Sequence, residues 1–515
     1  MKLKNILRNV TAMALPLALL GSCTGDFEEL NTNPYEIDPE ELPFEAQFST
    51  PLSFSYPTHQ NLFQYWTSLS IDNYGGYFEV PHSNWTMARY DLARGFCGGM
   101  HENFMQKIFN NTRRLIKQCD AAGQHDFAAV ARIVEAYNLL QYTDTYGPVP
   151  YSSVLAADEL AERPSSYAYD KQEDIYKAIF AQLDKALEGL DTETAGLASF
   201  DCWCNGDRTL WKKIANQLKL RMALRIVKVN PVDAEKYAKE AIQAGVLEDK
   251  DILINKSYSN ELRRMMDWLD SGIGSSIVAF MNGYNDPRRA VMFTQGYWNK
   301  KSDYYGIRVG IDPRDKSTMV EAFSNQLVSS SSPYLWFNAA EATFLRAEWE
   351  LRWGSLDAAK ELYEDAIALS FEERGASGAE SYVTSTAKPA KYIDPMSEYS
   401  ADAPASDISI AWEAGDTEEV RERNLERIIT QKWIAIFPLG IEAWSEYRRT
   451  GYPRLLPVVE NKSGGTVDSR YGMRRIPYPV EEYTENPVHL QAAIDMLGGR
   501  DNGGVRVWWD VKPLQ

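Results

Sequence analysis

Two segments rich in aromatic residues carry the side chains best suited to recognising a ligand. One is NYGGYFEVPHSNW at residues 73–85 and the other lies near residue 300. The candidate rings are Tyr74, Tyr77, Trp85, Tyr284, Tyr297, Trp298, Tyr304 and Tyr305. Tryptophan and tyrosine rings stack on the C–H faces of pyranose sugars, while asparagine, aspartate and arginine bind the hydroxyls. Alternatively, the rings pack under their loops as satellite cores. We expect two or three of the eight rings to be exposed. Exposed aromatic patches usually mark binding sites.

Signals for catalysis are sparse. The sequence contains no GxSxG, P-loop, GxGxxG or HExxH motif, and its five histidines show no ligand spacing. Glu442 and Glu446 lie one helical turn apart beside Trp444, and they could be the carboxylate pair of a glycosidase. The pattern also fits a surface network in which Glu446 pairs with Arg448 or Arg449 and locks a helix end. We favour the network, and the sequence predicts neither a catalytic residue nor a cofactor.

Cys23 is positioned for lipidation. A basic N-terminus precedes an apolar run over residues 10–20, which is too short to span a bilayer and is typical of a secretory signal peptide. The letters LGSC that end at Cys23 resemble the bacterial lipobox, whose cysteine is acylated. We therefore predict a signal peptide over 1–22 and a lipidated tether over 23–50. The acidic residues after Cys23 resemble the surface-export signal of lipoproteins from glycan-foraging Gram-negative bacteria, which indicates the extracellular face of the outer membrane.

The charge balance argues against nucleic acid as a partner. The chain has 54 basic and 72 acidic side chains, a net charge of −18, and a negative surface repels a phosphate backbone. The other four cysteines, Cys97, Cys119, Cys202 and Cys204, lack the CxxC and histidine spacing of a zinc site, so no metal site is predicted. Cys97 and Cys119 could form a disulfide, whereas Cys202 and Cys204 are too close in sequence for an easy one.

Paired helices are the elements that must position these side chains. Apolar residues recur at spacings of three and four over about 98–146, 175–187, 210–242, 340–369 and 420–437. Gly354, Ala359, Tyr363 and Ala366 match the spacing of a tetratricopeptide repeat. Long irregular segments are expected near 53–97, 250–335 and 372–419, the last of them facing solvent. The sequence predicts one all-α domain over 51–515, a tetratricopeptide-like scaffold of helical pairs with long irregular loops.

Several segments together resemble the SusD/RagB family of nutrient-binding lipoproteins, in its second SusD-like branch. In chain order they are Cys23 with DFEELNTNP, LLQYTDTYGPVPYSS at 139–153, WKKIANQLKLRMALRI at 211–226, EATFLRAEWELRWG at 341–354, ITQKWIAIFPLGIEAWSEYRRTGYPRL at 429–455, IPYPVEEYTEN at 476–486 and VWWD at 507–510. They cover nearly the whole chain. Each is modest alone, and jointly they are specific.

The resemblance implies a non-catalytic protein of the outer membrane. Members of the family cap a SusC-type TonB-dependent transporter on the extracellular face and pass it oligosaccharides or, in some members, peptides. The scaffold side would meet the transporter, and the loop side would carry the aromatic ligand surface. The leading hypothesis is therefore an oligosaccharide-binding lipoprotein. A peptide-binding member of the same system, an all-α glycoside hydrolase and a purely structural surface protein are the alternatives.

Overall fold

The computed structural model describes residues 42–55, 60–158, 164–254 and 260–511 of the chain. Contacts divide the chain into two compact units, residues 1–47 and 48–515, and the described part of the first unit contains helix α3 (Phe44–Gln47). The predicted signal peptide and Cys23 lie outside the described residues. Within the described ranges, no helix combines the length and apolar character that crossing a membrane would require.

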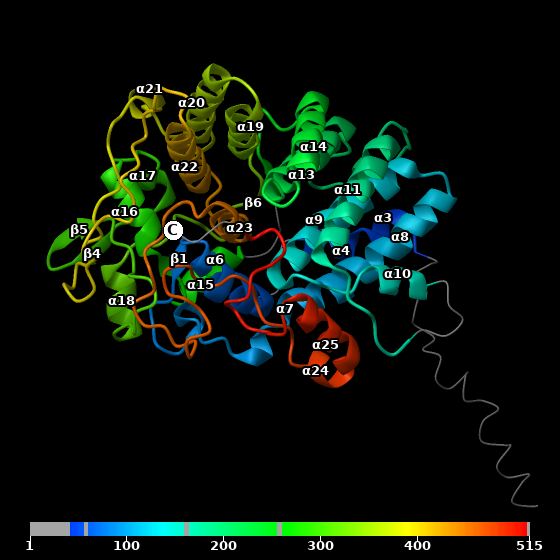
Figure 1. The fold of residues 1–515 in the computed structure, drawn as a ribbon, viewed down its shortest axis with the longest axis horizontal. Coiled ribbons are helices and arrows are strands. Elements are labelled where there is room, and N and C mark those ends of the chain that lie inside the picture. Colours follow the sequence, from blue (N-terminus) through cyan, green and yellow to red (C-terminus); the bar gives the residue numbers. More distant parts are fainter. Residues whose placement is uncertain (1–41, 56–59, 159–163, 255–259, 512–515) are drawn as a thin grey trace, which may run out of the picture. The chain divides into compact units, whose positions relative to one another are not determined.

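Helical pairs form the scaffold of the larger unit, and Figure 1 shows them following one another from α8 to α20. The paired helices are α8 (Asn110–Ala121), α9 (His125–Tyr146), α11 (Gln172–Gly189), α13 (Arg208–Arg225), α14 (Pro231–Ala244), α19 (Ala339–Trp353) and α20 (Leu356–Glu373). Helix α9 packs against both α8 and α11, α13 packs against α14, and α19 packs against α20. This arrangement confirms the prediction of an all-α scaffold of helical pairs.

The pair α19 and α20 follows from local sequence signals. The Asn338 side chain caps α19 by accepting a hydrogen bond from the Glu341 N–H at 2.8 Å, and Ser355 caps α20. Ala359, Tyr363 and Ala366 are fully buried, as the tetratricopeptide spacing predicts. The small side chains let the two helices approach, and the tyrosine fills the groove between them.

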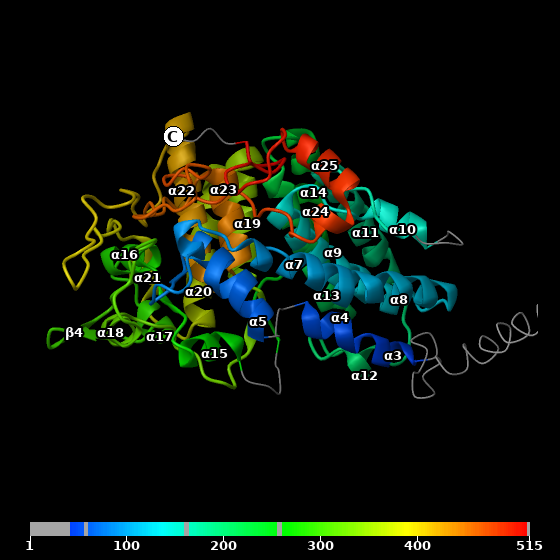
Figure 2. The same cartoon turned by 90° about the horizontal axis from the view of Figure 1, so that it is seen from below.

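Helices α22 (Glu418–Ala435) and α23 (Gly440–Thr450) lie beside this scaffold, and α19 packs against α22. The remaining helices are short: α4 (Ser49–Phe54), α5 (Gln60–Leu62), η2 (Phe63–Ile71), α6 (Asp72–Tyr74), η3 (Met87–Arg89), η4 (Arg94–Phe96), α7 (Gly99–Glu102), η5 (Asn103–Phe109), α10 (Ser152–Ala157), α12 (Leu197–Phe200), α15 (Glu261–Asp267), α16 (Ser275–Gly283), α17 (Arg289–Met292), α18 (Lys316–Ala322), α21 (Ala379–Val383), α24 (Glu482–Glu485) and α25 (Pro487–Met496). Figure 2 shows α16, α17, α18 and α21 at one end of the unit.

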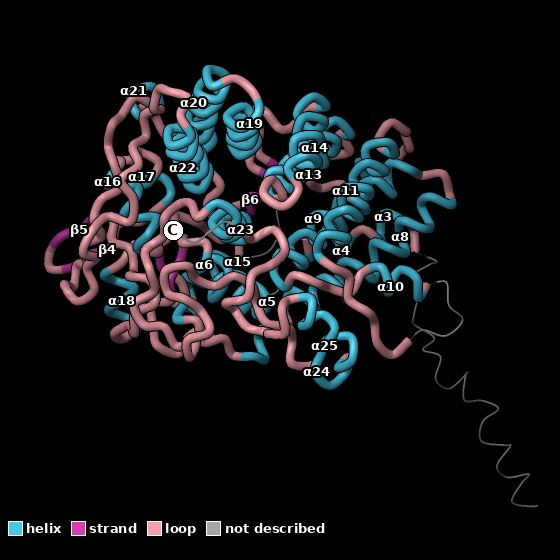
Figure 3. Tube along the Cα trace, viewed as in Figure 1, coloured by secondary structure: helices cyan, strands magenta, loops and turns pink. Residues whose placement is uncertain are grey.

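Short antiparallel strand pairs tie the loop regions together. Strand β1 (Phe78–Glu79) pairs with β3 (Gly272–Ile273), β2 (Ile252–Ile254) with β6 (Tyr334–Phe337), and β4 (Gly296–Trp298) with β5 (Lys301–Asp303). The first pair joins segments that are almost 200 residues apart in the sequence. Figure 3 shows that loops, drawn in pink, predominate around β4, β5 and α18.

Two of the expectations for irregular segments need correction. Residues 60–74, inside the segment 53–97, form a helical run in which nine residues adopt π-helical hydrogen bonding. Four polar residues, Gln64, Thr67, Ser68 and Ser70, interrupt the apolar residues of that run. Residues 372–419 do not simply face solvent, because four of their large side chains are buried: Tyr382, Tyr392, Ile408 and Ile410.

Candidate ligand-binding site

Three of the predicted rings are buried and present no surface to a ligand. Tyr77 has an exposed fraction of 0%, its ring stacks on that of Trp433 at 5.5 Å, and its hydroxyl donates to the Trp433 carbonyl oxygen. The hydroxyls of Tyr74 and Tyr284 donate to backbone carbonyl oxygens 3.1 Å away. A buried tyrosine whose hydroxyl has a partner is a stable packing element. The prediction of an exposed ligand surface is therefore wrong for these three rings.

Trp85 is half-buried and belongs to a group of three rings. Tyr65 stacks on Phe96 with ring centroids 4.0 Å apart, and Trp85 approaches both rings edge-on at 5.7 and 6.0 Å. The group packs on a buried cluster made of Leu69, Val80, Met87 and Ala88. Of these three rings, the sequence analysis predicted only Trp85. Tyr65 and Phe96 lie in η2 and η4, outside the segment of residues 73–85 from which the candidate rings were chosen.

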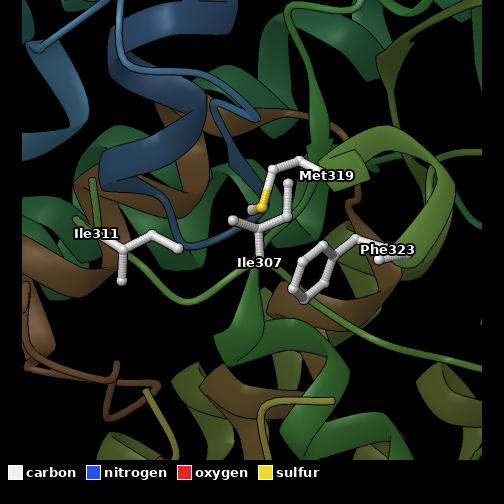
Figure 4. Packing of buried hydrophobic residues seen from close by; sticks show 5 residues of the cluster. Ile307, Ile311, Met319 and Phe323 are labelled. Atoms are coloured by element: carbon white, nitrogen blue, oxygen red, sulfur yellow. The ribbon is translucent and has the colours of Figure 1, made fainter. Parts of the chain in front are cut away.

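The other four rings lie on and beside the hairpin of β4 and β5, and we call them the hairpin rings. Tyr297 is 48% exposed, and Trp298, Tyr304 and Tyr305 are half-buried. Trp298 and Tyr305 pack against a buried cluster of Ile307, Ile311, Met319, Ala322 and Phe323. Figure 4 shows Ile307 between Met319 and Phe323 in this cluster. The hairpin rings therefore combine a rigid base with an exposed edge.

Local geometry fixes the hairpin. Asn299 and Lys300 have φ values of 48° and 63°, and two consecutive positive φ angles match the twist of a two-residue β-hairpin turn. The turn pairs Trp298 with Lys301 across the two strands. The Arg289 guanidinium lies 5.2 Å from the centre of the Tyr304 ring, which is a cation–π distance.

A buried carboxylate connects the loop of Trp85 to the segment that supports the hairpin rings. Asp270 accepts hydrogen bonds from Gln64 Nε2 at 2.6 Å, from His82 Nε2 at 2.8 Å and from Lys316 Nζ at 2.8 Å. Burial alone would raise the pKa of Asp270, but the bonds from His82 and Lys316 outweigh that effect and lower it. The carboxylate is therefore charged at neutral pH and holds three separate segments together.

A second polar connection lies beside the first. The Arg89 guanidinium binds Asp312 at 2.9 Å and Glu460 at 2.7 Å. The Glu79 carboxylate accepts a hydrogen bond from the Gly310 N–H at 2.9 Å. Burial raises the pKa of Glu79 to about 7, and its backbone hydrogen bonds only partly offset that rise. Both contacts fix the loop of residues 79–92 on the segment that follows the hairpin.

A cleft of about 780 Å³ opens beside Tyr65 and Phe96. Its lining comes from three separate parts of the chain: Phe54, Asn61, Leu62 and Tyr65; Gly95, Phe96, Gly98, Gly99, His101, Glu102, Asn103, Met105, Gln106 and Lys107; and Pro479, Glu481, Glu482 and Glu485. The volume is within the range of small-molecule sites. Sequence reasoning missed this cleft, because no local motif marks residues that meet only in the fold.

Glu442 and Glu446 are buried, so the expectation of a surface network is wrong. Glu442 binds Arg225, and Glu446 accepts from Arg449 Nε at 2.8 Å, which confirms the predicted Glu446–Arg449 pair. Burial would raise the pKa of both carboxyls, but the neighbouring cations outweigh it and lower both. A glycosidase acid needs the opposite shift, a raised pKa that keeps its proton available. The geometry therefore supports a structural role.

The cysteines contribute no disulfide to the described part of the chain. Cys97, Cys119 and Cys204 are buried thiols, and Cys202 is an exposed one. Within the described ranges, no three histidine, cysteine, aspartate or glutamate side chains are grouped so that they could hold a metal ion.

Comparison with known proteins gives a consistent result. The family model described as SusD-like, Susd and RagB outer membrane lipoprotein, matches residues 29–510. A solved SusD homologue from Bacteroides thetaiotaomicron is 37% identical, covers 92% of this chain and 100% of its own, and has a TM-score of 0.84. One from Bacteroides uniformis is 36% identical, with coverages of 91% and 99% and a TM-score of 0.84. A chitin-binding SusD homologue from Flavobacterium johnsoniae is 35% identical, with the same coverages and TM-score. No curated protein sequence matches the chain.

Proposed function

The chain belongs to the SusD-like family of outer-membrane lipoproteins, and we propose that it binds oligosaccharides at the cell surface and delivers them to a SusC-type TonB-dependent transporter. The family binds substrate rather than converting it, and structural neighbours include a chitin-binding homologue. A lipid on Cys23, following a signal peptide over 1–22 and preceding a tether over 23–50, would hold the domain of residues 51–515 on the extracellular face. Two-chain or three-chain acylation is sufficient for stable attachment.

The hairpin rings are the observation that carries the ligand proposal. Tyr297 is exposed at the edge of β4, and Trp298 and Tyr305 are rooted on a buried cluster, so a sugar would meet rings that need little reordering. Trp85 is the other predicted ring that remains accessible, in its own group. Ser302 lies opposite Tyr297, so polar atoms accompany the rings as sugar hydroxyls require.

Isothermal titration against a panel of neutral oligosaccharides tests the ligand. N-acetylglucosamine oligomers belong in the panel because of the chitin-binding neighbour. Tyr297→Ala and Trp298→Ala should each weaken binding by about 1–2 kcal/mol, which is roughly a five- to thirtyfold rise in Kd. Trp268→Ala is the matched control, because Trp268 is 37% exposed outside both ring groups. A panel ligand that binds all three variants as it binds the unchanged chain would refute the assignment of the hairpin rings.

Co-purification tests the partner. The full lipidated chain, expressed with a SusC-type transporter from the same gene cluster, should elute with it from detergent-solubilised outer membranes. A chain that elutes alone under conditions that keep the transporter folded would contradict the delivery role, while leaving the sugar-binding test independent.

A further inference from the structure

The cleft beside Tyr65 and Phe96 differs in chemistry from the hairpin rings. Four glutamates line it, Glu102, Glu481, Glu482 and Glu485, against one lysine, Lys107. Except for Glu482, these glutamate side chains are exposed. The lysine ammonium lies 5.5 Å from the centre of the Phe54 ring, so part of its charge already has a cation–π partner. The potential in the cleft is therefore negative and attracts a cation.

The inner wall of the cleft is fixed and adds no positive charge. Glu482 accepts hydrogen bonds from Asn486 Nδ2 at 3.2 Å and from the Tyr169 hydroxyl. His101 Nδ1 lies 2.6 Å from the Tyr142 hydroxyl, and burial lowers the pKa of His101 below its usual value. The imidazole is therefore neutral at pH 7, although glutamates surround it.

One lining side chain has an unused acceptor. Asn103 is 2% exposed, and its Nδ2 donates to the Phe54 carbonyl oxygen at 3.1 Å. Its Oδ1 has no hydrogen-bond partner among the described residues. Leaving a buried polar atom without a partner is unfavourable, so a ligand hydroxyl or ammonium that reaches this oxygen would be favoured. The observation is independent of the glutamates and indicates a donor-bearing ligand.

We propose that this cleft is a second binding site, distinct from the hairpin rings, and that it takes an amine-bearing sugar. The ammonium would lie among Glu102, Glu481 and Glu485, and the hydroxyls would meet the amides of Asn61, Asn103 and Gln106. The sugar body would contact the half-exposed Tyr65 and Phe96. Hydrolysis of the N-acetyl amide releases acetate and leaves an amine, which turns a neutral unit into a cationic one, so the cleft distinguishes the two forms of one sugar by charge.

A lysine-bearing peptide is the competing occupant, and the walls disfavour it. An extended peptide is usually bound by adding a strand to an open sheet edge, which supplies partners for its backbone N–H and C=O groups. The described lining comes from helices and their connections, including η2, α7, η5 and α24, whose internal backbone groups are already paired. The side-chain amides and carboxylates suit separate hydroxyl and ammonium groups better than a continuous backbone.

Binding of three probes to the full lipid-free chain tests the proposal. The probes are a β-1,4-linked glucosamine trimer, its fully N-acetylated form and trilysine, measured by titration calorimetry near pH 7, where amines of ordinary pKa are mostly protonated. We expect the amine trimer to bind at least tenfold more tightly than the acetylated trimer at low salt. This preference should shrink at about 0.5 M salt, because exposed charges are screened.

Variants locate the effect. Glu481→Gln with Glu485→Gln should weaken the amine trimer at least fivefold and leave the acetylated trimer unchanged. Glu235→Gln with Glu240→Gln, two exposed charges on α14, is the matched control and should change neither. Gly98→Ala should also weaken the amine trimer without lowering the melting temperature. A Cβ on Gly98 would lie 3.4 Å from Pro479 and 3.8 Å from Glu481 Oε2, an ordinary contact with the protein.

The outcomes separate this site from the hairpin rings. Trp298→Ala should leave the tight binding of the amine trimer intact. The assignment of the cleft is therefore tested independently of the assignment of the hairpin rings. Equal binding of the amine and acetylated trimers would overturn the proposal. So would tighter binding of trilysine, or an unchanged affinity in the Glu481→Gln, Glu485→Gln variant.

Discussion

Replacing Glu446 with glutamine removes one charge from the buried junction of α19, α22 and α23. Its carboxylate is 2% exposed and lies 3.0 Å from Lys432 Nζ, in addition to its pair with Arg449. Arg449 also binds Glu348 at 2.6 Å. Glutamine keeps the shape of the side chain but removes the negative charge that lies beside Lys432 and Arg449. The free energy of unfolding falls because positive charge is then buried without full compensation.

The expected magnitude follows from this burial. Breaking a buried ion pair from one side destabilises a protein by about 3–5 kcal/mol. An entropy of unfolding of about 2.1 cal/mol/K per residue over roughly 470 residues gives a Tm drop of about 3–5 °C. Burial raises the pKa of Glu446, yet Arg449 and Lys432 outweigh it and lower the pKa far below its unfolded value. The carboxylate therefore stabilises the fold fully above about pH 4.3, and this stabilisation is lost as the pH falls through the folded-state pKa.

Thermal and urea unfolding at pH 7 and near pH 4 provide the assay. Glu235→Gln on the exposed face of α14 is the control and should change stability by less than about 0.5 kcal/mol. Adding Lys432→Met to Glu446→Gln should recover at least about 1 kcal/mol, since it removes a buried cation whose nearest carboxylate is gone and whose remaining carboxylate, on Glu442, lies 3.8 Å away. A Glu446→Gln chain that melts within one degree of the unchanged protein, with no gain from Lys432→Met, would refute the reasoning.

Three further predictions concern a buried carboxyl, a tightly packed glycine and the thiols. The pKa of Glu79 is raised to about 7, so between about pH 4.3 and pH 7 the folded chain holds a proton that the unfolded chain has released. This proton favours folding at low pH, and its contribution to stability is lost as the pH rises through 7. Glu79→Gln should therefore reduce the fall in Tm between pH 6 and pH 8, and an unchanged fall would contradict this prediction. Gly283→Ala should lower the free energy of unfolding by about 1–3 kcal/mol in denaturant, because the added Cβ would lie 2.1 Å from the Ala390 nitrogen. Gly95→Ala is the control and should not change it, because a Cβ at Gly95 meets nothing within 4 Å. Cys202 should react faster with a thiol reagent than the other three described cysteines, because it is exposed and they are buried. Burial also raises the pKa of Cys97 to about 11 and raises that of Cys204. A fast phase of the thiol reaction that survives Cys202→Ser would contradict this.

The scaffold was predictable from the sequence because its information is local. The pair α19 and α20 is predicted by apolar spacing, a glycine break and side-chain caps that all lie within about 35 residues. Ring exposure is different, because it depends on distant partners. Tyr77 and Tyr297 both follow glycine, yet Tyr77 is covered by Trp433, which lies 356 residues further along the chain. The residues themselves carry no signal that separates the two cases.

The cleft could not be predicted for a related reason. Tyr65 comes from a segment expected to be irregular, and Glu481 comes from a segment chosen only for its family resemblance. Neither has a spacing that suggests a ligand. Their meeting depends on η2 being helical, since the helix places Tyr65 against Phe96 at 4.0 Å. The wrong expectation for residues 60–74 therefore concealed this cleft as well as a helix.

The polar contacts between loops explain how a mostly irregular region can present defined surfaces. Loops lack the hydrogen-bond ladder that holds a helix, so their positions depend on individual contacts. Asp270 joins three segments through Gln64, His82 and Lys316, and Arg89 joins the same loop to Asp312. Such polar contacts add little net stability compared with apolar packing, but they are satisfied in only one arrangement. Residues at the loop surface can then vary in type while these polar contacts keep the loops in place.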